Sequence, residues 1–228
     1  MIKVENIDVW GFEHAIRGAR NALQSWSRSD SRGCGHFING DFSFELGKND
    51  LDLLQRLYKA GSSHRKALRQ IFVSMDIIAP DYFFKEFSTY KVGTVENSTS
   101  TMHTIHKKKF ELDDFSHEHL FDNNEIIVPL SCERGDFRII NNTQWLMFTC
   151  DLLNNMREVY LKTKDKKYWW QIIQLLPMSY NYKRTITMNY ENVVTMINQR
   201  TGHKLDEWGS FIEVLKSLPY LKEIIGDE

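Results

Sequence analysis

Residues 176–200, LPMSYNYKRTITMNYENVVTMINQR, form the most regular stretch of the chain and decide its fold. The proline of Leu176-Pro177 ends the preceding helical pattern YWWQIIQLL, because a proline disfavours helix in the residue before it. A short strand is predicted near Thr185–Met188. The last twelve residues, NYENVVTMINQR, place apolar side chains at helical spacing, which predicts a helix that ends at Arg200.

A second informative stretch is residues 71–103, IFVSMDIIAPDYFFKEFSTYKVGTVENSTSTMH. Its first nine residues are apolar and β-branched and stop at Pro80, which predicts a buried strand. The next residues, PDYFFKEFSTY, predict a helix opened by its proline. The run TVENSTSTMH offers several hydroxyl and backbone donors, which suit either a ligand-binding loop or a polar strand edge.

The remaining segments add helices and a few short strands. Asn49-Asp50 precedes a predicted helix that Gly61 ends, and apolar spacing predicts a long helix over 144–162. EIIVPL and FRII are candidate short strands, and the tail 205–225 is amphipathic. A chain of 228 residues with this mixture predicts one α+β domain over residues 1–228.

The two stretches together resemble the flavin-dependent thymidylate synthases. That family has a Leu-Pro, a Tyr-rich strand, an Asn and a helix ending in Arg, in the order found at 176–200. Upstream it has a strand, an Ala-Pro, a helix and the signature Arg-His-Arg, seven residues, Ser. Here the signature becomes Thr89-Tyr90-Lys91, seven residues, Thr99. The resemblance implies the fold of that family, a central antiparallel sheet with long helices.

The resemblance also implies a reaction. Family members transfer a one-carbon unit from methylenetetrahydrofolate to carbon 5 of dUMP, and FAD passes on reducing equivalents from NADPH. Such chemistry requires a flavin held against a pyrimidine, cations at the phosphates and a polarising group at the uracil carbonyl. Because family members build each site from several subunits of a tetramer, a homo-oligomer is expected here.

The resemblance assigns roles to particular residues. Arg200 matches the arginine that lies against the pyrimidine, where a planar fork can stabilise developing negative charge, so it is the predicted catalytic and substrate-binding residue. Its alternative role is that of a last-turn arginine that complements the helix dipole. Asn189 is either a flavin contact or a helix cap, and His203 either a flavin contact or an exposed loop histidine. The predicted cofactor-binding residues are Tyr90, Lys91, Thr94, Asn97, Asn189 and His203, and the other substrate-binding residues are Glu86, Thr99 and Thr101.

Several cations of the family pattern are missing. Arginines are replaced by Thr101, Ile173 and Glu191. A charge-assisted hydrogen bond contributes about 1.5 to 3 kcal/mol, so three losses without replacement weaken a phosphate ligand by roughly three to six decades. Lysines and arginines elsewhere are candidate replacements: Lys85, Lys91, Lys183, Arg184, Arg17, Arg20 and Arg28. A nucleotide-binding or structural relative that has lost the reaction is therefore the alternative function.

Two further classes of function have weaker support. His103, His106, His117 and His119, with Asp113, Asp114 and Glu118, could supply pairs of metal ligands, but no complete ligand set is specified and three lysines follow at 107–109. No metal is therefore predicted. Arginines near the N-terminus, Trp10 and Trp26 could contact nucleic acid. The formal net charge of −1 provides no general positive field for such a partner.

Composition and cysteine usage indicate the compartment. Hydrophobic residues make up 42% and charged residues 26%, as in ordinary globular proteins. No stretch reaches the roughly 18 apolar residues of a spanning helix, and MIKVENIDVW lacks the layout of a signal peptide. Cys34, Cys132 and Cys150 show no C-x-x-C spacing, so reduced thiols are expected. A cytoplasmic protein without membrane contact is predicted.

Overall fold

The structure, a computed structural model, describes residues 2–33, 35–38, 42–122, 128–131 and 137–226. These residues form two compact units that alternate along the chain. The helical unit consists of Ala79–Tyr82 and Thr99–Tyr182, and the sheet unit of Ile2–Ile78, Phe83–Ser98 and Lys183–Glu228. The expectation of one domain over 1–228 stays a prediction.

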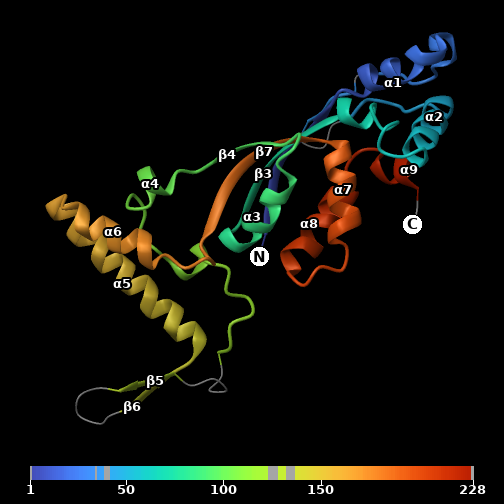
Figure 1. Cartoon of the computed structure of the whole chain (residues 1–228). Helices are drawn as coiled ribbons and strands as arrows, with labels where there is room; N and C mark the ends of the chain where they lie inside the picture. Colours follow the sequence, from blue (N-terminus) through green and yellow to red (C-terminus); the bar gives the residue numbers. More distant parts are fainter. Residues whose placement is uncertain (1, 34, 39–41, 123–127, 132–136, 227–228) are drawn as a thin grey trace. The chain divides into compact units, whose positions relative to one another are not determined.

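A five-stranded sheet in the order β2-β1-β3-β7-β4 forms the centre of the sheet unit (Figure 1). β1 pairs antiparallel with β2 and with β3, and β4 pairs antiparallel with β7. The α+β class and the antiparallel sheet are therefore confirmed. The strands are β1 (Lys3–Trp10), β2 (Phe37–Ile38), β3 (Phe72–Pro80), β4 (Val95–Ser98) and β7 (Asn181–Asn189).

β7 is longer than the strand predicted near Thr185–Met188. Its first residues, NYKR, are polar or aromatic and lack the apolar alternation of a half-buried strand. Pairing with β4 begins only at Arg184, which lies opposite Ser98, while Thr185 lies opposite Asn97. Residues 181–183 therefore precede the part of the strand that β4 pairs with.

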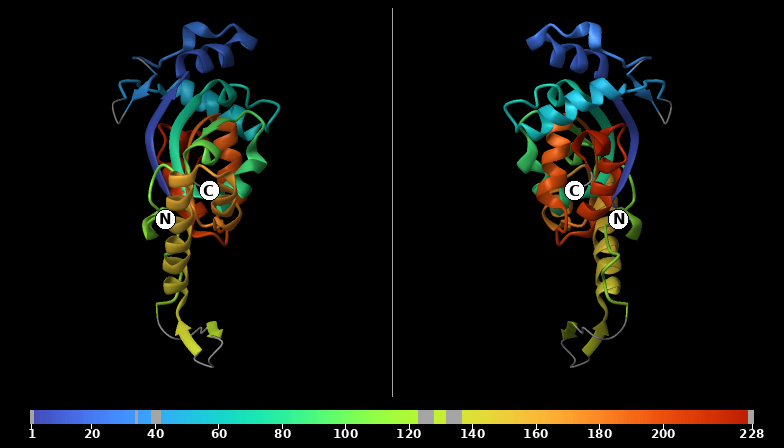
Figure 2. Two further views of the ribbon diagram at one scale, coloured as in Figure 1. Left: turned by 90° about the vertical axis from the view of Figure 1, so that its left-hand side faces the viewer. Right: turned by 90° about the vertical axis from the view of Figure 1, so that its right-hand side faces the viewer.

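The helices of the sheet unit match several of the predicted elements (Figures 1 and 2). The helix that the sequence places before Gly61 is present, and Gly61 has φ +95°, the left-handed conformation that suits a helix end. The helices and single 3₁₀ turns here are α1 (Phe12–Arg20), η1 (Asn21–Leu23), η2 (Trp26–Arg28), α2 (Lys48–Lys59), η3 (Leu68–Gln70), α3 (Asp81–Phe87), η4 (Ser88–Tyr90), α7 (Tyr190–Arg200), α8 (Asp206–Lys216) and α9 (Leu221–Ile225).

The core of the sheet unit joins β3 to aromatic residues of α3 and α8. Alternate residues of β3, such as Val73 and Met75, are buried. Trp208 is fully buried, with its ring centroid 4.8 Å from that of Phe83 and 6.3 Å from that of Phe87. Full burial of each such side chain stabilises the fold by about 1.5 to 3 kcal/mol. This packing fixes α3 against α8 beside the end of α7.

The helical unit is built on a pair of packed helices, α5 (Asn142–Thr163) and α6 (Lys166–Leu175), which confirm the two predicted helices (Figure 1). Buried Asn154 ties α5 to the preceding loop, since its amide accepts from the backbone N–H of Phe110 at 2.8 Å and donates to its carbonyl at 2.9 Å. Its other elements are α4 (Thr101–Thr104), η5 (Leu112–Asp114), β5 (Val128–Ser131) and β6 (Phe137–Ile140).

β5 and β6 pair antiparallel; β5 overlaps the candidate strand EIIVPL and extends it to Ser131, and β6 coincides with FRII, while residues 125–127 lie outside the described part. In the ranges that the structure describes, no helix combines the length and the apolar character needed to cross a membrane.

Asp76 ties three strands of the sheet together. Its carboxylate accepts hydrogen bonds from Asn6 of β1 at 2.9 Å and from Thr185 of β7 at 2.6 Å, and it pairs with the Lys183 ammonium at 2.8 Å. The hydrogen bonds from Lys183, Thr185 and Asn6 lower the pKa of Asp76 to about 2. The ionised carboxylate therefore stabilises the folded state.

We expect Asp76→Asn to lower the free energy of unfolding by about 1 to 2 kcal/mol at pH 7, since a shift of one pKa unit corresponds to about 1.4 kcal/mol before solvent screening. Because the folded-state pKa lies below the ordinary value of 3.8, this contribution is complete above about pH 4 and is lost as the pH falls towards 2. Urea unfolding of both proteins between pH 7 and pH 3 measures it. Asp52→Asn, which removes an exposed pair with Arg56, is the control. A difference that stays constant with pH would contradict the assignment.

Candidate functional site

Arg200, at the end of α7, lies at the centre of a polar cluster in the sheet unit. Its Nη1 donates to Glu86 Oε2 at 2.7 Å and its Nε donates to the Tyr90 hydroxyl at 2.9 Å. Nη2 makes only a 3.5 Å contact with the Thr89 hydroxyl. The side chain is 14% exposed. The predicted residues Glu86, Tyr90 and Arg200 are therefore in direct contact, and one edge of the guanidinium is weakly bonded.

Aromatic rings fix the orientation of this guanidinium. The Arg200 Cζ lies 5.0 Å from the centroid of the Trp208 ring and 5.5 Å from that of Tyr90. Tyr90 in turn donates to Gln199 Oε1 at 3.1 Å. Because Trp208 is fully buried, Arg200 has a rigid apolar support on one side. The sequence pattern gave no signal for Trp208, since a tryptophan on an amphipathic helix is most simply a core residue.

His203 also belongs to the cluster. Its Nδ1 accepts from the backbone N–H of Leu205 at 3.2 Å, and its Nε2 lies 3.0 Å from Arg200 Nη1 and 3.9 Å from Glu86 Oε2. A neutral imidazole has only one acceptor nitrogen, and an arginine can only donate. The backbone N–H of Leu205 and the guanidinium of Arg200 therefore compete for the one acceptor nitrogen, and the tautomer decides from which of them the ring accepts. The predicted His203 thus contacts Arg200, one turn beyond the end of the helix.

Asn189 caps α7, because its side-chain oxygen accepts from the backbone N–H of Asn192 at 3.1 Å. Asn192 in turn donates to the carbonyl of Val92 at 2.6 Å and lies 3.5 Å from the hydroxyl of the predicted Thr94. Gly93 has φ +78°, and a Cβ there would lie 2.9 Å from the Asn192 side chain. The segment after the signature is therefore held tightly against the start of α7.

A cavity of about 390 Å³ lies beside this segment. It is large enough for one planar ring system, and small-molecule sites commonly begin at this size. Of the predicted residues, Tyr90 and Asn189 line it. The full lining is Arg69, Thr89, Tyr90, Val92, Gly93, Asn189, Glu191, Asn192 and Thr195.

Glu191 places an unusual carboxylate in the cavity wall. Its Oε2 is buried and has no hydrogen-bond partner among the residues that the structure describes, and its Oε1 is 4.0 Å from Arg65 Nη1. Burial raises the pKa of Glu191, and the charges of Arg65 and Arg69 only partly oppose this. One carboxylate oxygen of the cavity wall is therefore left without a donor within the described ranges.

The other predicted residues lie outside this cluster. Lys91 is exposed at the end of η4, and Asn97 is exposed on β4 opposite Thr185. Thr99 and Thr101 belong to the helical unit, where Thr101 begins α4. Arg69, Asn192 and Thr195 line the cavity without having been predicted. The spacing of Asn192 and Thr195 from the cap Asn189, three and six residues along one helix, could have indicated them.

The described residues contain no group of three or more His, Cys, Asp or Glu side chains that could hold a metal ion. The histidine-rich segment 103–119 thus provides no metal site of that kind within the described ranges. Cys150 is a free, buried thiol, and burial followed by the charges of Asp114 and Asp151 raises its pKa to about 11. Cys34 and Cys132 lie outside the described residues.

The cavity suits the polar edge of a planar ring. Asparagine amides and threonine hydroxyls can donate or accept, and Glu191 accepts. Arg69 opposite Glu191 leaves no net positive charge in the lining, so the cavity alone does not neutralise a diphosphate. The residues present therefore fit the ring of a flavin or a pyrimidine but not the phosphates of these ligands.

Solved structures resemble the chain over almost its whole length. Two structures of thymidylate synthase X from Helicobacter pylori, with FAD and dUMP, have TM-scores of 0.64 and 0.63 and 18% identity, and the matches cover 99% and 98% of this chain and 97% of each of theirs. The UMP/dUMP methylase PolB from Streptomyces cacaoi, bound with 5-Br dUMP, has a TM-score of 0.58 and 13% identity, covering 96% of this chain and 90% of that one. No family model and no curated protein matches the chain. At these identities the likeness establishes the fold: this chain is folded like the flavin-dependent thymidylate synthases.

Proposed function

We propose that this chain catalyses the reductive methylation of dUMP, or of a related pyrimidine nucleotide, with FAD, methylenetetrahydrofolate and NADPH. The observation that carries the proposal is the cluster of Arg200, Glu86 and Tyr90 beside the cavity lined by Asn189, in a chain with this fold. The solved structures with this fold contain FAD and dUMP or a brominated pyrimidine nucleotide.

Arg200 has the geometry of a group that polarises a substrate. Two of its donors are already used by Glu86 and Tyr90, which hold the guanidinium plane in place. Its Nη2, with one long contact to Thr89, is the donor that a uracil carbonyl oxygen can engage. A preorganised donor at that oxygen stabilises negative charge that develops when carbon 5 reacts. Bound FAD supplies the reducing equivalents.

A ring with N–H groups would suit the carboxylate of Glu191 better than a phosphate would. The Glu191 side chain is 17% exposed and lines the cavity, and uracil and flavin rings both carry an imide N–H from which a carboxylate can accept. We propose that Asn189 and Glu191 contact such a ring edge. The phosphates then require cations from other parts of the assembly, among which the exposed Lys91 is one candidate.

A homo-oligomer, by analogy a tetramer, would provide those cations. Several large apolar side chains of α5 are exposed: Trp145 is 45%, Met147 52% and Phe148 56% exposed. Neighbouring apolar residues on one helix mark an interaction surface. Association through this surface is consistent with a site that is completed by other subunits.

The alternative is a protein that binds a nucleotide or a flavin ring without catalysing the reaction. Two observations favour it: Glu191 stands where the family has an arginine, and the Arg200 charge is already paired with Glu86. Both reduce the positive potential that an anionic ligand meets. Binding of a nucleotide or a flavin without turnover would support this alternative.

Purified protein is expected to show visible flavin absorption after incubation with FAD, and to oxidise NADPH in the presence of methylenetetrahydrofolate only when dUMP or UMP is added. We expect Arg200→Lys to reduce kcat by about 10² to 10³-fold while the protein still binds flavin. A lysine keeps the positive charge but lacks the planar guanidinium with its fixed donors. Arg56→Lys, in the last turn of α2 and paired with Asp52, is the matched control with unchanged turnover. Flavin or nucleotide binding with no methylated product would reject the catalytic role and support the alternative.

Glu191→Gln is expected to raise the free energy of unfolding by about 1 to 3 kcal/mol at pH 8, since it removes an unsatisfied buried charge. Because the folded-state pKa of Glu191 is raised, the ionised form destabilises the fold above that pKa, and the gain shrinks as the pH falls towards 4.5. Denaturant unfolding between pH 8 and pH 4.5 measures the change. Glu213→Gln, which removes an exposed pair with Lys216, provides the comparison. An unchanged or lower stability at pH 8 would show that Glu191 is satisfied in solution.

A further inference from the structure

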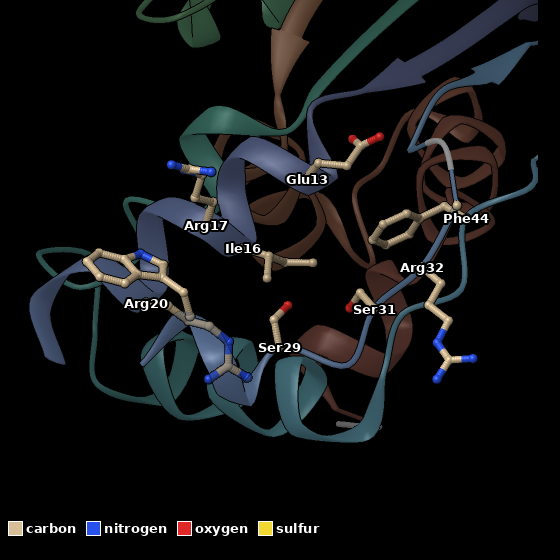
Figure 3. A pocket seen from close by; sticks show the side chains of 10 residues that line it. Glu13, Ile16, Arg17, Arg20, Ser29, Ser31, Arg32 and Phe44 are labelled. Atoms are coloured by element: carbon tan, nitrogen blue, oxygen red, sulfur yellow. The ribbon is translucent and has the colours of Figure 1, made fainter. Parts of the chain in front are cut away.

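A second cavity of the sheet unit, of about 370 Å³, has no role in the proposed reaction (Figure 3). It shares no lining residue with the cavity beside Asn189. Arginines and serines gather around it, among them Arg17 and Arg20, two of the candidate replacement cations. Its lining is Glu13, Ile16, Arg17, Arg20, Trp26, Ser29, Ser31, Arg32, Gly33 and Phe44.

A buried aspartate builds one wall of this cavity. Asp50 is fully buried, and its Oδ2 accepts from the hydroxyls of Ser29 at 2.8 Å and Ser31 at 2.7 Å, and from the backbone N–H groups of Asp30 and Ser31 at 3.0 Å. Burial raises the pKa of Asp50, but the hydrogen bonds from Ser31, Ser29 and Arg20 outweigh this effect, and the net shift is downward. The loop 29–31 is therefore held in one conformation by a carboxylate.

Arg20 completes this wall and is not free to bind a ligand. Its Nε donates to Asp50 Oδ1 at 2.6 Å, and its Nη1 donates to the carbonyl of Ser25 at 3.3 Å. Its Nη2 is also 2.6 Å from Asp50 Oδ1 but lacks the angle of a hydrogen bond. The side chain is 4% exposed. Arg20 and Asp50 neutralise each other inside the wall.

Two other arginines of the lining, Arg17 and Arg32, differ from Arg20 in their exposure and pairing. Both are exposed, and within the described residues neither side chain has a hydrogen bond or an ion pair. Both belong to the lining, and Figure 3 shows their guanidinium groups on opposite sides of Ile16 and Ser29, each turned outward. The carboxylate of Glu13, also in the lining, accepts from the backbone N–H of Gly35 at 2.6 Å. With Arg20 neutralised by Asp50, two free cations and one engaged carboxylate leave the edge of the cavity positively charged.

The middle of the cavity is apolar. Figure 3 shows Ile16 and Phe44 turned towards it, and these side chains are 4% and 5% exposed. Trp26 adds an indole that is 48% exposed, and its Nε1 donates to Asn21 Oδ1 at 2.8 Å, which holds the ring. A half-exposed, oriented tryptophan beside apolar side chains is suited to stacking on a flat ring. Apolar walls with a few charged groups at the edge are the usual composition of a small-molecule site.

We infer that this cavity binds a small planar aromatic anion, with the ring against Trp26, Ile16 and Phe44 and the anionic group at the rim arginines. A phosphate and a carboxylate both suit a guanidinium, which donates to two oxygens at once. The ligand class is therefore an aromatic ring that carries a phosphate, as in a nucleotide, or a carboxylate. This site does not depend on the reaction proposed for Arg200.

Isothermal titration of the whole chain with AMP and with p-aminobenzoylglutamate tests the inference and separates the two anionic groups. We expect saturable binding of at least one of them, with adenosine at least tenfold weaker than AMP if the nucleotide binds. The double variant Arg17→Gln, Arg32→Gln should weaken that binding by about tenfold to a hundredfold, as expected for lost charge-assisted bonds. The two single variants identify the arginine that contacts the anion.

Two controls keep the test specific. Arg28→Gln changes an exposed arginine that is two residues from Trp26 but outside the lining, and it should leave binding unchanged. Trp26→Leu should weaken the aromatic ligands at least fivefold but leave any binding of inorganic phosphate unchanged. Absence of saturable binding by either aromatic anion, an unaffected double variant, or equal loss in Arg28→Gln would each overturn the site.

Discussion

Antiparallel pairing of β4 with β7 is the contact on which the arrangement of the candidate site depends. It places Val95 opposite Thr187, a few residues before α7 begins, and so brings the segment 89–94 to the start of that helix. Asn192 and Asn189 then hold this segment from the helix side. Packing of Trp208 against Phe83 and Phe87 fixes α3, so that Glu86 meets Arg200. The cluster and its cavity thus follow from sheet pairing and aromatic packing together.

The two cavities of the sheet unit differ in their electrostatics. The one beside Asn189 contains a carboxylate without a donor, and its neighbouring guanidinium is paired with Glu86. The one beside Trp26 has two exposed arginines without partners among the described residues, and its only buried arginine is neutralised by Asp50. Positive charge without a described partner thus lies at the edge of a cavity that shares no lining residue with the one beside Asn189.

Much of the fold could be predicted from the sequence because its signals are local. Proline and glycine positions and apolar spacing indicated β3, α2, α5, α6 and α7, and the helix ending at Arg200 was correct. The early start of β7 was not predicted, since its first residues, NYKR, are polar or aromatic and lack the apolar alternation of a half-buried strand. Among the site residues, the contact of Arg200 with Glu86, Tyr90 and His203 joins positions that the resemblance named. Arg69 and Trp208 were missed because only tertiary packing brings them to the cluster. No periodicity could have revealed that one carboxylate oxygen of Glu191 has no donor among the described residues.

The alternation of the two units along the chain has a consequence for how the protein folds. Glu96 of β4 and Arg184 of β7 form an ion pair across 88 residues of sequence, and most of the helical unit lies between them. Closing so long a loop costs conformational entropy before the strands gain any pairing energy, and contacts of this separation slow folding. If α5 and α6 pack early, the loop becomes effectively shorter. The rate at which β7, the last strand in sequence, pairs with the sheet would then depend on how early the helical unit forms.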